Sequence, residues 1–252
     1  MSGEARQIWR SKLTFAYLDE PPFCFPCAGS QPSGCDVELA QIILAAIGVR
    51  DVQFVLATFA DLLPGLTSGR WTMTTGMFVT PDRRRIVEFS RPIWALPDGF
   101  LVRKGNPRRL VSYAAVARDG TARLGIVRGQ VQWDAALSAG VPVGRILVYE
   151  TQDEAAAAVL RGEVDAYASV AMAHRGYIER LAVNTLACID LGKEDSAEPP
   201  TPAFGAFAFG FSNDGLRDLV DQGLAAFLGS KDHRNLMQGY GFSDSEIDRV
   251  ID

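Results

Sequence analysis

The chain has 252 residues, of which 48% are apolar and 22% charged, the composition of an ordinary globular protein with a sizeable core. This length fits one large domain or two small ones. With 25 basic and 30 acidic residues the net charge is −5, which excludes an overall positive field for nucleic acid or an anionic membrane. No uncharged apolar run approaches the ~20 residues that a membrane span needs.

The first six residues lack the basic and then apolar layout of a signal peptide. On this basis either a leader has been removed or the protein is cytosolic.

The elements of the first half alternate between strand and helix patterns, which predicts an α/β fold with largely parallel sheets. Residues 37–47 have apolar residues at helical spacing, after Asp36 as a cap and before Gly48 as a stop. Pro64 is expected to interrupt a short helix at 59–66. The strands expected here are 13–18, 52–56 (buried), 74–79 and 100–103.

The second half repeats this alternation without a close sequence repeat, so the two blocks are expected to share architecture only. Predicted strands are 124–127, 146–149, 165–168 and 204–211. Predicted helices are 131–138, 154–161, 216–228 and 233–239. Residues 193–202 are polar and rich in proline, which predicts a loop.

The cysteine spacing leaves three interpretations open. Cys24 and Cys27 form a C-x-x-C pair, and either could bridge to Cys35 across a Gly-, Ser- and Pro-rich loop. Free thiols, or a redox or zinc pair, are the alternatives. Neither His174 nor His233 is near in sequence to complete a zinc site, so we expect no metal.

Arg83 follows the β-rich segment 74–79 at a short offset, within Thr80-Pro81-Asp82-Arg83. A guanidinium is planar and always charged, and its donors match a carboxylate. Gly76 in the preceding strand lets a ligand approach the backbone closely. The pattern predicts a carboxylate clamp. The alternative is a surface arginine in the basic run 83–85.

Five segments extend this pattern along nearly the whole chain, from about residue 13 to 242. They are 34–40 (GCDVELA), 59–66 (FADLLPGL), the arginine segment with Phe89-Ser90-x-Pro92, 125–130 (GIVRGQ) and 162–166 (GEVDA). The series resembles the polar-amino-acid type of extracytoplasmic solute-binding protein that feeds ABC importers.

The resemblance implies the α/β, two-lobed periplasmic binding protein type 2 fold. Each lobe would be a mainly parallel sheet flanked by helices, with the ligand cleft between the lobes. The chain would cross near 94–100 and 202–210, so that lobe 1 is 1–98 with 207–252 and lobe 2 is 99–206. Ligand binding would close the lobes about these crossings.

The resemblance also assigns a candidate site. Arg83 becomes the lobe-1 clamp, with Gly76 and Phe78 beside it. On lobe 2, Gln130 and Val131 stand at a helix start whose N–H groups face the same carboxylate, although the family commonly has Thr at Gln130. Members that bind common α-amino acids usually carry an acid where this chain has Ser169 or Val170, so lobe 2 offers no acid for a ligand ammonium.

Glu20, Phe23, Phe59 and Phe78 suggest a different pocket for the cationic end of a ligand. Aromatic faces attract delocalised or quaternary cations, by roughly 0.5 to 2 kcal/mol each, and Glu20 would add a directional partner. This set is similar to the ectoine and hydroxyectoine binders of the family. The alternative is that the phenylalanines are core residues.

We therefore expect the substrate-binding component of an ABC importer that captures a small carboxylate-bearing zwitterion, either an amino acid or an ectoine-like compatible solute. Its partners would be this ligand and a membrane permease, with no nucleic acid and no cofactor. We expect a monomer outside the cytoplasm, because the resemblance favours a removed leader.

Two alternatives are a receptor's ligand-sensing domain and a dehydratase derived from the binding fold. A dehydratase needs a general acid over the ligand. Residues 168–173 offer no Asp or Glu, and His174 is the titratable side chain beside them. We therefore expect no catalytic residue and no enzyme.

Overall fold

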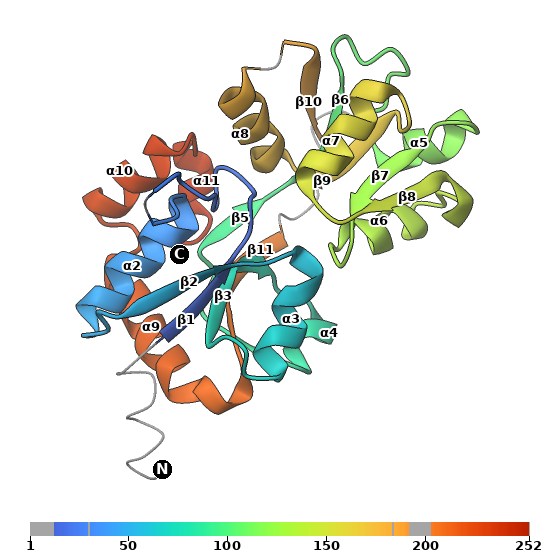
Figure 1. The fold of residues 1–252 in the computed structure, drawn as a ribbon. Coiled ribbons are helices and arrows are strands. Elements are labelled where there is room, and N and C mark those ends of the chain that lie inside the picture. The colour runs from blue at the N-terminus through green and yellow to red at the C-terminus, as the bar shows by residue number, and fades with distance from the viewer. Residues whose placement is uncertain (1–12, 30, 183, 192–202, 252) are drawn as a thin grey trace. The chain divides into compact units, whose positions relative to one another are not determined.

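The computed structural model describes residues 13–29, 31–182, 184–191 and 203–251. The chain divides into two compact units, Met1–Ala95 with Ala203–Asp252 (unit 1) and Leu96–Pro202 (unit 2). In each unit helices pack around one β-sheet (Figure 1). No helix in the described ranges is long and apolar enough to cross a membrane.

Unit 1 is built on a six-stranded mixed sheet of order β2-β1-β3-β11-β4, with β5 paired to β11. Strand β1 runs parallel to β2 and β3, whereas β11 runs antiparallel to β3 and β4. The strands are β1 (Leu13–Tyr17), β2 (Val52–Leu56), β3 (Met73–Phe78), β4 (Glu88–Phe89), β5 (Trp94–Leu96) and β11 (Ala203–Phe209). The α-helices are α2 (Cys35–Ala46), α3 (Phe59–Thr67), α4 (Pro81–Arg84), α9 (Asp214–Phe227), α10 (Lys231–Gly239) and α11 (Asp244–Asp248).

Three details of unit 1 correct the sequence predictions. The predicted buried strand 52–56 is present as β2, but its residues are half-buried or exposed because β2 pairs with β1 and ends the order of the sheet. Helix α3 runs through Pro64, whose missing N–H removes a single backbone bond of the helix. Asp36 is not a cap: Gly34 takes that position, and Asp36 is buried within the first turn of α2.

Unit 2 has a five-stranded mixed sheet of order β10-β6-β9-β7-β8. Strand β7 is parallel to β8 and β9, while β6 is antiparallel to β9 and β10. The strands are β6 (Asp98–Arg103), β7 (Leu124–Val127), β8 (Ile146–Tyr149), β9 (Ala166–Val170) and β10 (Leu186–Asp190). The α-helices are α5 (Tyr113–Asp119), α6 (Gln132–Ser138), α7 (Gln152–Arg161) and α8 (Ala171–Leu181).

The core of unit 2 lies between this sheet and its helices. Phe100, Leu124 and Ile126 are at most 1% exposed, and Tyr113 and Trp133 of α5 and α6 pack against the same cluster. Helices α5 and α8 and strand β10 are elements that the sequence patterns did not indicate. The predicted loop 193–202 lies outside the described residues.

Candidate functional site

Arg83 is turned inward at the end of β3 by the short helix α4. Thr80 caps that helix by accepting a hydrogen bond of 3.2 Å from the backbone N–H of Arg83. The Arg83 side chain donates from Nη1 to the carbonyl of Phe78 at 2.7 Å, and its guanidinium carbon lies 5.3 Å from the centre of the Phe59 ring. Arg83 is only 6% exposed, so it is not the surface arginine of the alternative interpretation. Arg85, by contrast, is exposed and pairs with Asp82.

A cluster of buried aromatic rings lies behind Phe78. The Trp94 ring is 5.3 Å from both Phe23 and Phe78, centre to centre, and Phe23 also meets Phe242 at 6.3 Å. Trp94 lies flat against the backbone of β11, because a Cβ added at Gly205 would be 2.1 Å from its ring. Phe23 and Phe78 therefore pack largely on Trp94. Of the three predicted phenylalanines, Phe59 is the most exposed.

Asp36 joins this cluster to β3. One carboxylate oxygen accepts from the Thr75 hydroxyl at 2.7 Å and the Gly76 backbone N–H at 2.8 Å. The other oxygen accepts from the Trp94 indole N–H at 3.2 Å. Burial raises the pKa of Asp36 to about 6, although these hydrogen bonds act in the opposite direction. Sequence reasoning missed this role, because it assigned Asp36 to a cap and left Trp94 unplaced.

Glu20, Cys24 and Cys27 lie in the segment between β1 and α2, whereas Cys35 begins α2 and Cys188 lies on β10. Glu20 is half-buried, and its backbone N–H donates to the carbonyl of Cys24 at 2.8 Å. Of the three interpretations of the cysteine spacing, the structure agrees with free thiols, because none of the four cysteines forms a disulfide. The Cys24 sulfur accepts instead from the Leu18 N–H at 3.3 Å, and burial raises the pKa of the Cys24 thiol well above its usual range. No group of three or more His, Cys, Asp or Glu in the described ranges is placed to hold a metal ion.

In unit 2, Gln130 and Val131 lie between β7 and α6, as expected; Gln130 is buried and Val131 is half-buried. The turn that leads to them needs Gly129, whose φ of 83° disfavours any residue with a side chain. Next to this turn is a hollow of about 180 Å³, lined by Ile126, Val127, Arg128, Gly129, Trp133 and Val148. Gln132, the first residue of α6, donates to the Asp98 carboxylate at 2.7 Å, and this hydrogen bond fixes the first turn of α6 to the start of β6.

Ser169 lies near the C-terminal end of β9, and His174 lies in the first turn of α8. Ser169 is 2% exposed and stands opposite Gly99 of β6 in the sheet register. His174 is fully buried, with Nε2 3.1 Å from the Gly99 carbonyl and its ring edge-on to Tyr167. Burial lowers the pKa of His174 to about 3, which leaves a neutral, enclosed imidazole.

The structure thus brings Arg83, Phe59 and Phe78 into contact, and it links Gly76 and Phe23 to them through Asp36 and Trp94. Glu20 is held beside Phe23 by the turn after β1, in which the Phe23 backbone N–H donates to the Glu20 carbonyl at 3.0 Å. Within unit 2, Gln130 and Val131 are adjacent, while Ser169 lies on a different strand.

Residues 13–243 match the family model of bacterial extracellular solute-binding proteins, family 3. The chain belongs to this family. A curated relative is the probable amino-acid ABC transporter periplasmic-binding protein y4tE of Sinorhizobium fredii (strain NBRC 101917 / NGR234). It is 31% identical over 259 residues, which cover 96% of this chain and 81% of the relative.

Solved structures share the fold of this solute-binding protein. EhuB in complex with hydroxyectoine superposes with a TM-score of 0.83 at 26% identity, over 99% of this chain and 96% of that one. The ancestral amino acid-binding protein AncCDT-1, a precursor of cyclohexadienyl dehydratase, superposes with a TM-score of 0.79 over 94% and 99% of the chains. Its 23% identity shows the fold alone.

These findings confirm the predicted α/β fold of two-lobed periplasmic binding proteins and the role of a substrate-binding protein of the ABC-importer type. The family is extracellular and the curated relative periplasmic, and membership implies a small-molecule ligand and a membrane permease as partners.

Proposed function

We propose that this solute-binding protein captures a small zwitterion whose carboxylate binds to Arg83, and delivers it to an ABC permease. The observation that carries the proposal is the buried guanidinium of Arg83, which is oriented by the Phe78 carbonyl and packed over Phe59. A guanidinium that is held in one orientation at low exposure is a strong partner for a planar carboxylate, because two N–H groups can donate in parallel.

The other predicted residues complete the site in this proposal. Gly76 offers its backbone, and Phe23, Phe59 and Phe78 form apolar and aromatic walls. Gln130 and Val131 contribute backbone N–H groups and Ser169 a hydroxyl from unit 2. As in hinge-type binding proteins, we expect the ligand to draw the two units together.

The proposed ligand is an amino acid or an ectoine-like compatible solute, with the second favoured. Residues 168–173 carry no acid to pair with a compact ammonium. A delocalised cation needs less directional pairing, and Glu20 with the rings of Phe23 and Phe59 would suffice for it. That EhuB was solved with hydroxyectoine agrees with this preference for this chain.

A thermal-shift screen of the purified protein tests the proposal. Its panel contains ectoine, hydroxyectoine, glycine betaine, arginine and glutamine. A ligand that binds only the folded state adds about 2.7 kcal/mol at a hundredfold excess over its Kd. We expect shifts with ectoine or hydroxyectoine. A shift confined to arginine or glutamine would contradict the proposed cation pocket and leave the carboxylate clamp in place.

Substitution of Arg83 then tests the clamp with any ligand that binds. Arg83→Ala should cost about 2 to 5 kcal/mol of binding free energy, since it removes the partner of a buried charge. Arg85→Ala is the matched control, because this nearby arginine is exposed and pairs with Asp82. Calorimetry that gives the same Kd for wild type and Arg83→Ala would show that the carboxylate binds elsewhere.

We also propose that the ligand is released unchanged. The titratable side chain expected nearest to the ligand on unit 2, His174, is enclosed and neutral, so it is not placed to donate a proton. Incubation with prephenate or arogenate should give no product, and turnover would refute this point. Light scattering of the purified protein, with and without ligand, tests the expected monomer.

A further inference from the structure

Basic side chains are concentrated in one stretch of unit 2. Residues 103–123 contain six basic residues and one acidic residue, a net charge of +5 in a chain whose net charge is −5. This stretch forms the end of β6, the following loop, α5 and the approach to β7. All six basic residues are exposed, and we call them the basic surface: Arg103, Lys104, Arg108, Arg109, Arg118 and Arg123.

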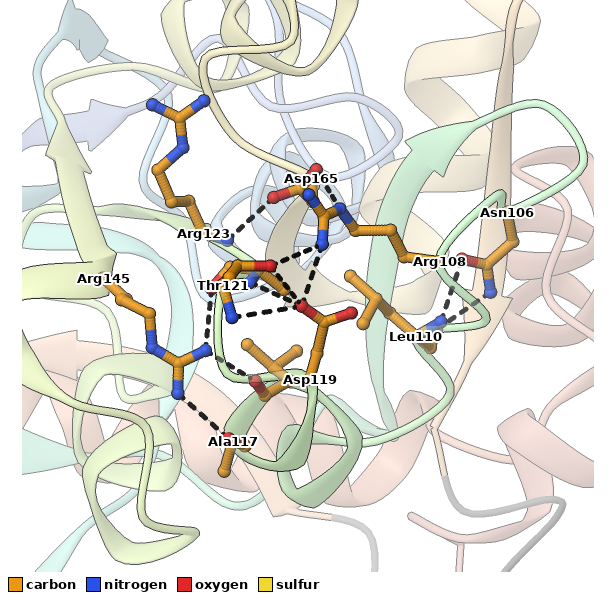
Figure 2. A network of polar contacts seen from close by, with 11 residues as sticks. Asn106, Arg108, Leu110, Ala117, Asp119, Thr121, Arg123, Arg145 and Asp165 are labelled. Atoms are coloured by element: carbon orange, nitrogen blue, oxygen red, sulfur yellow. Dashed lines mark hydrogen bonds and ion pairs between the residues drawn. The ribbon is translucent and has the colours of Figure 1, made fainter.

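Arg108 organises this surface, as Figure 2 shows. Its guanidinium bonds to Asp119 at 2.8 Å and Thr121 at 2.9 Å through Nη1, and to Asp165 at 2.7 Å through Nε. Asp165 also accepts from the backbone N–H of Arg123 at 2.8 Å. A single arginine therefore binds the carboxylates of Asp119 and Asp165, and it fixes the loop to the end of α5 and to the residue that precedes β9.

The loop that presents Arg108 and Arg109 is closed on itself. The Asn106 side chain donates to the Leu110 carbonyl at 3.0 Å and accepts from the Leu110 N–H at 2.9 Å (Figure 2). Asn106 and Arg109 both have positive φ, 43° and 53°. These contacts hold the loop in one shape, so a partner would meet basic groups that are already arranged.

Two arginines of the basic surface, Arg103 and Arg123, both lie close to Gly162. The Arg123 guanidinium donates to the Gly162 carbonyl at 2.9 Å, and the Arg103 guanidinium lies 3.7 Å from the position that a Cβ on Gly162 would take. Within the described part of the chain, Arg103, Lys104, Arg109 and Arg118 make no ion pair. Their charges are therefore not neutralised by the protein itself.

We propose that this basic surface binds anionic phospholipid headgroups, and so keeps unit 2 close to a membrane. Guanidinium groups pair well with phosphate oxygens. Each Lys or Arg near an anionic lipid surface strengthens binding about fivefold. The negative charge elsewhere on the chain opposes this only weakly, since exposed charges more than about 10 Å apart are largely screened at 0.1 M salt.

The composition of the surface favours lipid over an acidic protein. Protein interfaces centre on buried aromatic or apolar anchors. None of the large apolar side chains exposed in the described ranges lies between residues 103 and 123. A surface of charged groups without such an anchor suits a diffuse layer of phosphates.

Co-sedimentation with lipid vesicles tests the proposal on the full chain. One set of vesicles contains equal parts of phosphatidylglycerol and phosphatidylcholine, and the other phosphatidylcholine alone. We expect binding to the anionic set at low salt, weaker binding at about 0.15 M salt, and none to the neutral set. Failure to bind the anionic vesicles at low salt would overturn the proposal and point to an acidic protein partner instead.

A pair of charge-matched variants locates the binding surface. Lys104→Gln/Arg109→Gln removes two unpaired charges and should weaken binding about 25-fold. Arg50→Gln/Lys231→Gln removes two exposed basic residues from unit 1 and changes the net charge equally; it should change binding less than about twofold. Equal losses for both pairs would show attraction to net charge alone and refute a defined surface. Thermal unfolding verifies that each variant is folded.

Discussion

Replacement of Asp36 by asparagine should change how stability depends on pH. Asp36 is 1% exposed, and a fixed N–H group donates to each of its oxygens, from Gly76 to one and from Trp94 to the other. An amide has a single acceptor oxygen. Whichever way the substituted side chain turns, its NH2 group faces one of these donors, and a buried donor without an acceptor costs about 1 to 3 kcal/mol.

The pH dependence distinguishes the cost of the unpaired donor from the effect of the charge on Asp36. Burial raises the pKa of Asp36 in the folded state from 3.8 to about 6. Between these values the folded state binds more protons than the unfolded state, so the stability from this group is fully present below pH 3.8 and is lost as pH rises through about 6. The stability difference between wild type and Asp36→Asn should therefore fall by about 2 to 3 kcal/mol between about pH 4 and pH 7.

Urea unfolding of both proteins at one-unit pH steps measures this difference directly, and the titration of all other groups cancels in it. A second variant, Thr75→Val, removes the 2.7 Å hydrogen bond that most favours the ionised form, so it should extend the pH-dependent range above 6. A flat difference between wild type and Asp36→Asn would refute the raised pKa. A difference that grows with pH would show that the hydrogen bonds outweigh burial.

Two further predictions concern packing and the thiols. Gly205→Ala forces a Cβ to within 2.1 Å of the Trp94 ring and should destabilise unit 1 by about 1 to 3 kcal/mol, whereas Gly215→Ala in α9 meets nothing within 4 Å and should stabilise by about 0.5 to 1 kcal/mol; thermal unfolding compares them. A thiol reagent should label two cysteines in the native protein, Cys27 and Cys188, and all four after denaturation. Four fast-reacting thiols, or none before or after denaturation, would contradict the structure.

The bounds of an element were predicted correctly where a single local sequence pattern determines them. The strands 52–56, 124–127 and 146–149 have the observed bounds, because short apolar runs between turn residues indicate buried or half-buried strands. Helix α8 was missed because its start carries neither a capping side chain nor a clear apolar period. A helix that lacks both signals cannot be recognised from its local sequence.

The sequence proposes residues for the candidate site, which stay a prediction, but it does not give the contacts that connect them. The Thr80-Pro81 start of α4 indicates a helix, but only the packing of its single turn decides that Arg83 points inward and Arg85 outward. Asp36 accepts from residues 40 and 58 positions away, and no local signal distinguishes such a carboxylate from a helix cap. Long-range hydrogen bonds of this kind depend on the tertiary fold.

These connections raise the question of what holds Arg83 in place. Asp36 binds Trp94, the Trp94 ring packs on Phe78, and the Phe78 carbonyl binds Arg83. Trp94→Phe keeps a ring in this position but removes the N–H that reaches Asp36. If packing orients the clamp, Trp94→Phe should weaken ligand binding by less than about fivefold, or about 1 kcal/mol, because the lost hydrogen bond is remote from the ligand.

Trp94→Ala provides the contrast, because it removes the ring as well. It should cost about 3 to 5 kcal/mol of stability and loosen Phe78 at the same time, so its affinity is measured at a temperature where unfolding data show it folded. We expect a loss of affinity well beyond that of Trp94→Phe. Equal losses for both variants would mean that the hydrogen bond to Asp36, and not the packed ring, positions Arg83, and the pH that titrates Asp36 would then also set the affinity for the ligand.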